Sequence, residues 1–290
     1  MNLVFDAGNT NLKMGIFDAN DLIYFEHLNN FSNSYFQEIV LKYKSIKSVC
    51  VSNNANFLSE LPRLCREFDI KYLQISHLTN LPITIDYLSP ESLGNDRIAL
   101  AVGSTKIKGD KLIIDFGTCI TYDLVLGNNF IGGQISPGFD VRLSSLNYYT
   151  SKLPKINLED VDNVIGKNTN ECMLIGVIDS VLFELEKVIE KYKKRFPSIQ
   201  VIVTGGGYQP SVFHESRGTF ARNQELRRRF GENNRFISSR KTLLMNGLVA
   251  QGLAAIGFEE NAFRRVLENL DPSFAVQEQP GFSPGDQRFR

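Results

Sequence analysis

Two periods of hydrophobic and polar residues alternate along the N-terminal part of this chain. Short apolar runs and strict alternation predict strands, whereas apolar residues that recur at helical spacing predict helices. The predicted elements are a strand hairpin over Leu3–Phe17, a helix over Ser34–Lys44, a strand over Ser48–Ser52, a helix over Phe57–Phe68 and a strand over Lys71–Ile75. This order predicts an α/β fold, with helices layered on a sheet.

A second section of the chain opens with another hairpin-like pattern, at Leu112–Val125. The longest helical pattern follows over Glu171–Phe196, and it ends in basic residues that suit the negative end of a helix dipole. Pro197 ends this helix because proline lacks a backbone N–H. A strand over Gln200–Val203 then leads into consecutive glycines, so the α/β pattern continues.

The composition changes after Gly207. Residues up to Gly207 include 15 lysines and 5 arginines, whereas the residues after it include 1 lysine and 11 arginines. Little periodicity is visible over Gly207–Arg240, a helical pattern returns over Lys241–Ile256, and the segment beyond Asp271 lacks the apolar residues that would order it. We therefore expect lobes at residues 1–110 and 111–258, with an atypical stretch at 207–240, and a partly disordered tail at 259–290.

Bulk composition favours a protein with two lobes and a small ligand. A chain of 290 residues with 42% apolar residues most often forms two moderate cores. Its 32 basic and 32 acidic residues cancel, so no net field draws it to nucleic acid or to a membrane. The cysteines are too widely spaced to predict disulfides or a zinc site. No signal-peptide pattern and no apolar run of ~18 residues are visible, which predicts a cytoplasmic protein.

The two hairpin-like stretches resemble each other. In LVFDAGNTNLKMGIF and LIIDFGTCITYDLV, three apolar residues precede an aspartate, and a glycine and polar residues follow before a second apolar strand. The aspartates, Asp6 and Asp115, lie 109 residues apart, which is too long a period for a solenoid. The repeat therefore predicts two related lobes that face each other.

Each turn has the chemistry of a phosphate-binding loop. Glycine lets backbone N–H groups approach phosphate oxygens, and Asn9, Thr10, Thr118 and Thr121 add side-chain donors. An aspartate before each turn can hold a hydrated Mg²⁺ ion against the phosphates. Two such turns facing each other would grip a polyphosphate from both sides.

Either turn alone could instead be an ordinary hairpin, in which glycine supplies a positive φ and aspartate hydrogen-bonds the turn. That interpretation is the commoner one for a single turn, and the duplication reverses the preference. The segment Thr204–Gly206 could add a platform for a nucleoside. Because the P-loop and the GxGxxG motif are both absent, a nucleotide would bind through a different fold.

The segment between the hairpins carries candidate substrate residues. Asn95 is a candidate N-cap of a helix, which places Asp96 and Arg97 in the first turn. Asp96 could simply suit the positive helix end, but Arg97 gains nothing there. The pair better suits a site in which Asp96 accepts a hydroxyl proton and Arg97 binds a polar or anionic substrate. The segment Gly132–Gly138 is predicted to form a close-packed turn near this site or an ordinary loop.

Five motifs together resemble those of the type III pantothenate kinases, in order and in approximate spacing. They are DAGNTNLK (Asp6–Lys13), LGNDR (Leu93–Arg97), DFGTCITYD (Asp115–Asp123), GGQISPG (Gly132–Gly138) and IGKNT (Ile165–Thr169), within a resemblance that covers residues 1–206. That family belongs to the acetate kinase, Hsp70 and actin-like superfamily. The resemblance implies two actin-like (ribonuclease H-like) lobes, each a mixed sheet flanked by helices, with ATP in the cleft between them.

The resemblance also implies a reaction, cofactors and a subunit arrangement. The reaction is ATP-dependent phosphorylation of the pantothenate hydroxyl to 4′-phosphopantothenate, the first step of coenzyme A biosynthesis. The implied cofactors are Mg²⁺ and a monovalent cation, K⁺ or NH₄⁺. The implied assembly is a homodimer that shares its substrate site across the interface, and the long helix from Glu171 would help to build that interface.

By the same resemblance, individual residues take roles. Asp96 would be the base and Asp115 would hold the monovalent cation. The chemistry of the first turn, described above, assigns Asp6 to Mg²⁺ through water. The implied ATP contacts are Asp6, Ala7, Gly8, Asn9, Thr10, Asn11, Leu12, Lys13 and Thr118. The implied pantothenate contacts are Tyr87, Gly94, Asn95, Asp96 and Arg97, with Thr169 reaching the site across the dimer interface.

The chain departs from the family pattern in two places. Cys119 stands where a small alanine is usual, and a cysteine is tolerated there because it behaves as a small apolar residue. The stretch Gly207–Arg240 stands where the family normally continues into a short final helical segment.

Two other functions fit part of the pattern. A sugar or carboxylic acid kinase on the same fold would explain the hairpins, but it leaves Tyr87 and Arg97 without a specific role. A non-catalytic regulatory protein of the same scaffold could use the arginine-rich segment Arg217–Arg240 as an interaction surface, although such a run is more often a solvated face. The presence of Asp6, Asp96 and Asp115 favours a catalytic protein over a non-catalytic one, so pantothenate kinase is the leading prediction.

Overall fold

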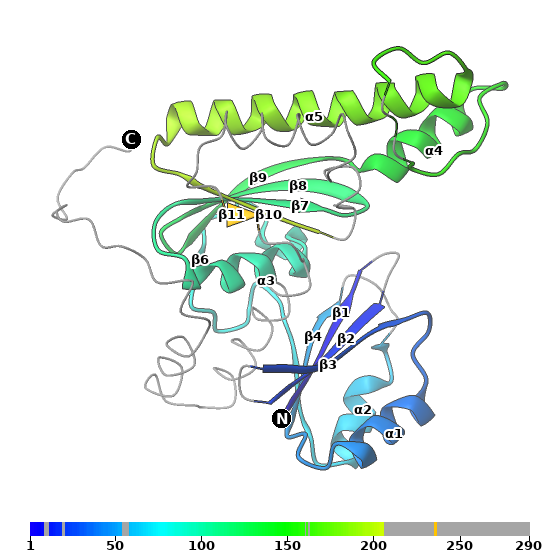
Figure 1. Cartoon of the computed structure of the whole chain (residues 1–290). Coiled ribbons are helices and arrows are strands. Elements are labelled where there is room, and N and C mark those ends of the chain that lie inside the picture. The colour runs from blue at the N-terminus through cyan, green and yellow to red at the C-terminus, as the bar shows by residue number, and fades with distance from the viewer. Residues whose placement is uncertain are drawn as a thin grey trace, which may run out of the picture.

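The strands form two mixed sheets with helices on their outer faces, one above the other in Figure 1. The computed structural model describes residues 1–8, 12–18, 21–53, 58–159, 161, 163–205 and 235–236. Each sheet contains both parallel and antiparallel pairs. The predicted arrangement of two α/β lobes is confirmed.

The first sheet has the strand order β3-β2-β1-β4-β5. Its central strand β1 pairs antiparallel with β2 and parallel with β4. Leu3 and Phe5 of β1 share a core with Phe36 of α1 and Leu61 of α2, so these helices cover the outer face of the sheet. The elements are β1 (Asn2–Ala7), β2 (Leu12–Asp18), β3 (Asp21–Leu28), α1 (Asn33–Lys42), β4 (Ser48–Asn53), α2 (Leu61–Glu67) and β5 (Lys71–Gln74).

The second sheet has the strand order β11-β10-β7-β8-β9-β6. Apart from β6, this order repeats that of the first sheet, because β7, β8, β9, β10 and β11 take the places of β1, β2, β3, β4 and β5. The elements are β6 (Thr84–Ile85), β7 (Lys111–Phe116), β8 (Cys119–Leu126), β9 (Asn129–Pro137), α4 (Phe139–Tyr149), α5 (Thr169–Arg195), β10 (Gln200–Thr204) and β11 (Arg235–Phe236). The repeat first visible in two hairpins therefore extends over five strands.

Helix α3 (Asn95–Gly103) lies between the two sheets (Figure 1). It is buried along almost its whole length, and it shares a core with Val4 and Cys50 of the first sheet and with Ile113 and Val125 of the second. Short 3₁₀ turns at Pro90–Ser92 and Ser104–Lys106 flank it. Strand β6 comes before residue 110 but pairs with β9 of the second sheet. The sheets therefore do not decide the predicted lobe boundary at residue 110, which stays a prediction.

Two predicted helix starts are wrong. The helix expected from Phe57 begins at Leu61, because Pro62 occupies its first turn, where the missing N–H costs nothing. The predicted N-cap Asn95 is the first helical residue of α3, and Gly94 is the cap. Gly94 is non-helical, with a φ of −56° and a ψ of 133°, and its carbonyl accepts the N–H groups of Arg97 and Ile98, which starts the helix one residue earlier.

The prediction that Gly132–Gly138 forms a turn or loop is also wrong, since most of this segment lies inside strand β9. A register shift between Leu124 and Val125 accommodates it, and Gly132 has a φ of 127° that favours glycine. A Cβ on Gly133 would lie 1.9 Å from the carbonyl oxygen of Tyr122. The glycines therefore let two strands approach closely.

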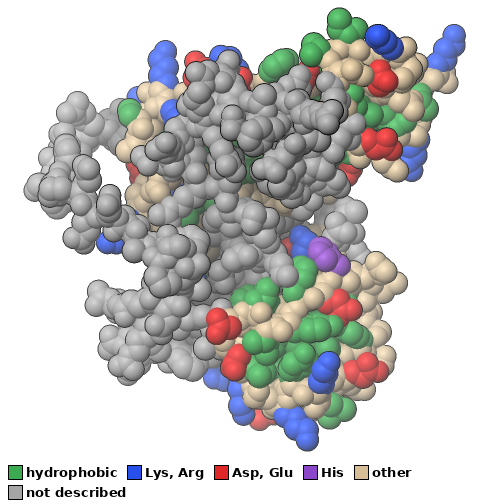
Figure 2. Space-filling view, viewed as in Figure 1, with side chains coloured by type: hydrophobic (Ala, Val, Ile, Leu, Met, Phe, Trp, Pro, Cys, Tyr) green, Lys and Arg blue, Asp and Glu red, His purple; other side chains and the backbone are tan. Residues whose placement is uncertain are grey.

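Helices α4 and α5 and the segment between them expose large hydrophobic side chains. They are Val141, Tyr148 and Tyr149 on α4, Val164 and Ile165 before α5, and Phe183 on α5. Figure 2 shows hydrophobic side chains among charged ones over the end of the molecule that carries α4 in Figure 1. No helix in the described ranges is both long enough and apolar enough to cross a membrane. The predictions for Lys241–Ile256 and the tail, and for most of Gly207–Arg240, lie outside the described residues.

Candidate active site

Asp6 and Asp115 occupy equivalent positions in the two sheets. Each is the next-to-last residue of a central strand, and each is almost fully buried. Side chains alternate along a strand, so Asp6 shares the face of Val4 and Asp115 shares the face of Ile113. Those two apolar residues pack in the core around α3. Both carboxylates therefore point to the inner faces of the sheets, toward the side on which α3 lies.

The residues that flank the two aspartates also correspond. Across the antiparallel neighbour, Asp6 lies opposite Lys13 and Asp115 lies opposite Thr121. Across the parallel neighbour, Asp6 is in register with Ser52 and Asp115 is in register with Thr204. Each aspartate is thus placed beside a buried hydroxyl group at the carboxyl end of a parallel strand, the usual edge for ligands in α/β sheets.

In the first lobe, Lys13 Nζ lies 3.4 Å from Asp6 Oδ2. Asp6 Oδ1 and Ser52 Oγ are buried and make no hydrogen bond to a described residue. Buried polar atoms need a partner, and a carboxylate beside a hydroxyl suits a hydrated divalent cation. Ala7, Gly8 and Leu12 border the turn, whereas Asn9, Thr10 and Asn11 lie outside the described residues.

In the second lobe, the turn Gly117–Thr118 is held against the start of α4. Gly138 donates its N–H to the carbonyl of Thr118 over 2.9 Å, and a Cβ on Gly138 would lie 2.3 Å from Gly117 O. Thr118 is exposed at the tip of the turn. Thr121 Oγ1 and Thr204 Oγ1 are buried without a hydrogen bond to the described part of the chain. These hydroxyl oxygens beside Asp115 fit a cation that prefers oxygen ligands.

Gly205, part of the proposed nucleoside platform, has a structural reason to be glycine. Its φ is 120°, and a Cβ there would lie 2.2 Å from the carbonyl oxygen of Phe116. Glycine therefore lets the chain after β10 pack on the backbone of β7. Gly206 lies outside the described residues.

Asp96 lies half-buried in the first turn of α3, as predicted from the sequence. Its Oδ1 accepts the backbone N–H of Arg97 over 2.9 Å. A Cβ on Gly94 would lie 2.5 Å from that oxygen, so glycine makes room for the Asp96 carboxylate. The arrangement keeps this carboxylate at the start of a helix that lies between the two lobes, with access to solvent.

Arg97 is buried and binds Asp123 of β8, a partner that the sequence did not reveal. Its Nε and Nη2 donate to Asp123 Oδ1 over 2.9 and 2.5 Å. Burial lowers the pKa of Arg97, but the charge and hydrogen bonds of Asp123 outweigh it, so the net shift is upward. Burial also raises the pKa of Asp123 to about 6, against the lowering effect of Arg97. The available signal was an acidic residue within an apolar strand, which is rare without a partner.

Two aromatic rings pack against the Arg97 guanidinium. Its Cζ lies 5.8 Å from the ring centroid of Tyr87 and 5.5 Å from that of Phe130. The structure therefore brings together two residues predicted to bind substrate, Tyr87 and Arg97, and places Gly94, Asn95 and Asp96 close by at the start of α3.

Glu184 of α5 joins the second hairpin to the long helix. Its carboxylate accepts hydrogen bonds from Tyr122 over 2.8 Å, from Ser136 over 3.0 Å and from Arg142. Burial would raise the pKa of Glu184, but these hydrogen bonds lower it below its ordinary value. The sequence alone does not reveal this residue, because a glutamate on a helix carries no sign of its partners.

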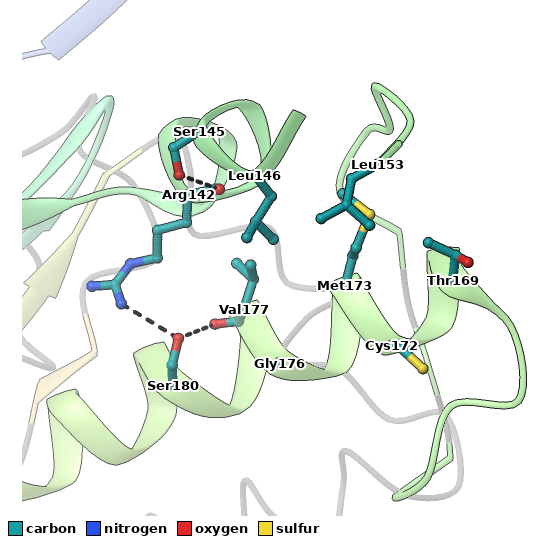
Figure 3. A pocket seen from close by; sticks show the side chains of 10 residues that line it. All are labelled: Arg142, Ser145, Leu146, Leu153, Thr169, Cys172, Met173, Gly176, Val177 and Ser180. Atoms are coloured by element: carbon teal, nitrogen blue, oxygen red, sulfur yellow. Dashed lines mark hydrogen bonds between the residues drawn. The ribbon is translucent and has the colours of Figure 1, made fainter. Parts of the chain in front are cut away.

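A largely apolar pocket of about 560 Å³ lies between α4 and α5 (Figure 3). Leu146 and Val177 point toward each other across it, and Arg142 closes one side through a 3.3 Å hydrogen bond to Ser180. Thr169 lies at the rim, at the exposed start of α5. Figure 1 shows this end of α5 well away from α3, so the start of α5 does not lie beside α3 within one chain.

Comparison with known proteins agrees with this geometry. The family model of the type III pantothenate kinases matches residues 2–191. The chain belongs to this family. The resemblance that the five sequence motifs indicated is thereby confirmed.

Relatives of the type III pantothenate kinase family cover most of the chain. The type III pantothenate kinase of Christiangramia forsetii is 35% identical over 215 residues, which are 72% of this chain and 87% of the relative. That of Phocaeicola vulgatus is 32% identical over 209 residues, which are 71% of this chain and 86% of the relative.

Solved structures share the fold at low sequence identity. A Campylobacter jejuni protein described as a Baf family transcriptional activator has a TM-score of 0.53 and 18% identity, and the match covers 88% of this chain and 100% of that chain. A Listeria monocytogenes protein described as an N-acetylmannosamine kinase has a TM-score of 0.50 and 13% identity, with coverage of 88% and 99%. These likenesses support the two-lobed, actin-like fold predicted for this type III pantothenate kinase chain.

Proposed function

We propose that this member of the type III pantothenate kinase family transfers the γ-phosphoryl group of ATP to the hydroxyl group of pantothenate, the first step of coenzyme A biosynthesis. One observation carries the proposal: two aspartate-bearing strand ends point inward from separate sheets, and α3 presents Asp96 between those sheets. This arrangement offers a phosphate site in each lobe and an acceptor site between them.

Asp96 is the proposed general base. In phosphoryl transfer the protein mainly positions groups and neutralises charge, so one carboxylate that orients the attacking hydroxyl is sufficient. Asp96 is half-buried and held at the start of α3, which supports this role. Tyr87, Gly94, Asn95 and Arg97 form the proposed pantothenate site around it.

The first turn is the proposed site for the phosphates of ATP and for Mg²⁺. Asp6 would hold the ion through water, supported by its buried Oδ1 beside Ser52. The backbone and side chains of Ala7, Gly8, Asn9–Asn11, Leu12 and Lys13 would bind phosphate oxygens. Bound there, Mg²⁺ would neutralise charge on the transferred phosphoryl group.

The second turn is the proposed site for the other side of ATP and for a monovalent cation, K⁺ or NH₄⁺. Thr118 at the exposed tip of the turn would contact ATP. Asp115 would hold the cation, and the buried hydroxyl groups of Thr121 and Thr204 support this assignment because they sit beside it in register.

A homodimer is the proposed assembly, with Thr169 serving the site of the partner subunit. The separation of α5's start from α3 within one chain supports this proposal. So do the exposed hydrophobic residues of α4, α5 and the preceding loop, which a partner subunit would cover. The proposed location is the cytoplasm, with no nucleic acid or membrane partner.

The experiment that tests the function is a turnover assay with ATP and Mg²⁺, with and without K⁺. Pantothenate is compared with a panel of sugars and short carboxylic acids, and the phosphorylated product is identified by mass. The expected result is phosphorylated pantothenate only, formed faster with K⁺. Turnover of a sugar or of another acid with no reaction on pantothenate would favour the alternative kinase, and no turnover of any acceptor would favour a regulatory protein.

A further inference from the structure

The Arg97–Asp123 ion pair is almost completely buried. The side chain of Arg97 is 7% exposed and that of Asp123 is 0% exposed. A buried ion pair is a weak device for stability, because apolar residues of similar size often serve as well. A buried pair beside a substrate site therefore calls for an explanation in terms of that site.

The pair fixes the orientation of the guanidinium group. Asp123 Oδ1 accepts hydrogen bonds from both Nε and Nη2 of Arg97, which restrains the plane of the guanidinium group along one edge. Tyr87 and Phe130 pack against the same group and restrain its remaining freedom. Arginine depends on such geometry, since its planar donors recognise an anion only when they are aligned with it.

Strand β9 is shaped to leave room for this arrangement. A Cβ on Gly133 would lie 2.9 Å from Asp123 Oδ1, the oxygen that binds Arg97. A Cβ on Gly132 would lie 3.5 Å from the ring of Tyr87. The adjacent glycines thus border both the carboxylate and one of the rings that hold Arg97.

Asp123 also lies close to the other carboxylates of the site. Thr121, Asp123 and Val125 alternate along β8, and Val125 packs in the core around α3, so Asp123 faces inward as Asp115 does. The charges of both Asp96 and Asp115 act on Asp123 and raise its pKa. Asp123 therefore belongs to the same electrostatic environment as the proposed base and the proposed cation ligand.

We propose that Asp123 is a positioning residue for the acceptor substrate: it holds Arg97 aligned with the polar and anionic groups of pantothenate while Asp96, the preceding residue on α3, meets the hydroxyl group. This inference rests on the proposed function. Asp123 does not touch the substrate, and it acts only through Arg97.

The test is a double-mutant cycle of Asp123→Asn and Arg97→Lys, with the KM for pantothenate, the KM for ATP and kcat measured for each variant. Asp123→Asn keeps the size and an acceptor oxygen but removes the charge. It should raise the KM for pantothenate about tenfold, as expected for one charged hydrogen-bond pair, and should leave the KM for ATP unchanged. In the Arg97→Lys background the same substitution should add little, because lysine cannot make the paired contact.

An unchanged KM for pantothenate, an equal rise in both KM values, or full additivity of the two substitutions would overturn the proposal. If Asp123→Asn does not fold, Phe130→Leu replaces it, because it removes a ring that packs on Arg97 and keeps the charge pair. The same selective rise in the KM for pantothenate is expected there, and equal changes in both KM values would count against the proposal. A wild-type chain without pantothenate turnover would instead refute the proposed function.

Discussion

Tyr122 donates its hydroxyl group to Glu184 over 2.8 Å, and this bond ties strand β8 to helix α5. Neighbouring residues on a strand point to opposite faces, so Tyr122 meets α5 on the outer face while Asp123 meets Arg97 on the inner face. One strand therefore connects the long helix to the candidate active site.

Glu184→Gln should weaken this connection. The amide keeps one acceptor oxygen but cannot pair with Arg142 and accept from Tyr122 and Ser136 together. We expect the free energy of unfolding to fall by about 1–3 kcal/mol, toward the lower end because the side chain is partly exposed. Urea denaturation measures this change. The control is Glu190→Gln, at an exposed glutamate of the same helix that pairs with Lys187. This variant should leave the midpoint of urea denaturation unchanged.

Gly133→Ala should destabilise the second lobe strongly. The added methyl group would lie 1.9 Å from a carbonyl oxygen of the adjacent strand, so one of the two backbones must move. We expect a loss of at least about 2–3 kcal/mol, in the range of overpacked cores. Gly176→Ala is the matched control, because that helical glycine has open space around its Cβ position and should gain about 0.5–1 kcal/mol. Equal thermal midpoints for both variants would contradict the close approach of β8 and β9.

Asp96→Asn should abolish phosphorylation while ATP still binds. The amide cannot accept the hydroxyl proton, and the loss of a general base costs about 10²–10⁴-fold in rate. Single-turnover product formation and equilibrium binding of ATP check the two parts separately. Asp69→Asn, an exposed residue of the first lobe with a φ of 54° that asparagine tolerates, should behave like the wild type. Full activity in Asp96→Asn would remove the base assignment.

Asp115→Asn should remove the response to monovalent cations. The amide contributes no charge beside Thr121 and Thr204, so added K⁺ should no longer raise the rate. Rates are measured over a K⁺ titration at constant ionic strength. Asp110→Asn, which keeps an acceptor for the N–H of Gly127, should retain the wild-type response. A normal K⁺ response in Asp115→Asn would place the cation elsewhere.

Stability should depend on pH through Asp123. Burial raises the pKa of this carboxyl group from an ordinary 3.8 to about 6, while Arg97 lowers it and Asp96 and Asp115 raise it. Between these two pKa values the folded state binds more protons than the unfolded state, so the free energy of unfolding falls as pH rises through this window. The fall attributable to Asp123 is at most about 3 kcal/mol.

The measurement is the difference in unfolding free energy between the wild type and Asp123→Asn at several pH values. That difference isolates Asp123 from groups with the opposite trend, such as Glu184, whose pKa is lowered. The wild type should lose stability relative to the variant as pH rises through the window between these pKa values. A constant difference would show that the two states bind this proton equally.

Local pattern was sufficient for most elements and for the repeat. Apolar runs predicted the hairpins and helical spacing predicted the long helix, each within a few residues, and the paired aspartates predicted two related lobes. These features depend on neighbours in sequence, because a strand or a helix must bury one face whatever lies against it. The family motifs could be identified for the same reason, since each is a short continuous segment.

Contacts between distant segments were decided only by the tertiary structure. The glycines of β9 look like a turn in sequence, but they lie within a strand because Tyr122 and Asp123 of β8 come too close for a Cβ. Nothing in the sequence shows that Arg97 is already paired, because 26 residues separate it from Asp123, the carboxylate that holds it. The sequence by itself determined most of the strands and helices and supplied the candidate residues for the chemistry. How those residues are paired and aimed depended on packing between segments that no local pattern specifies.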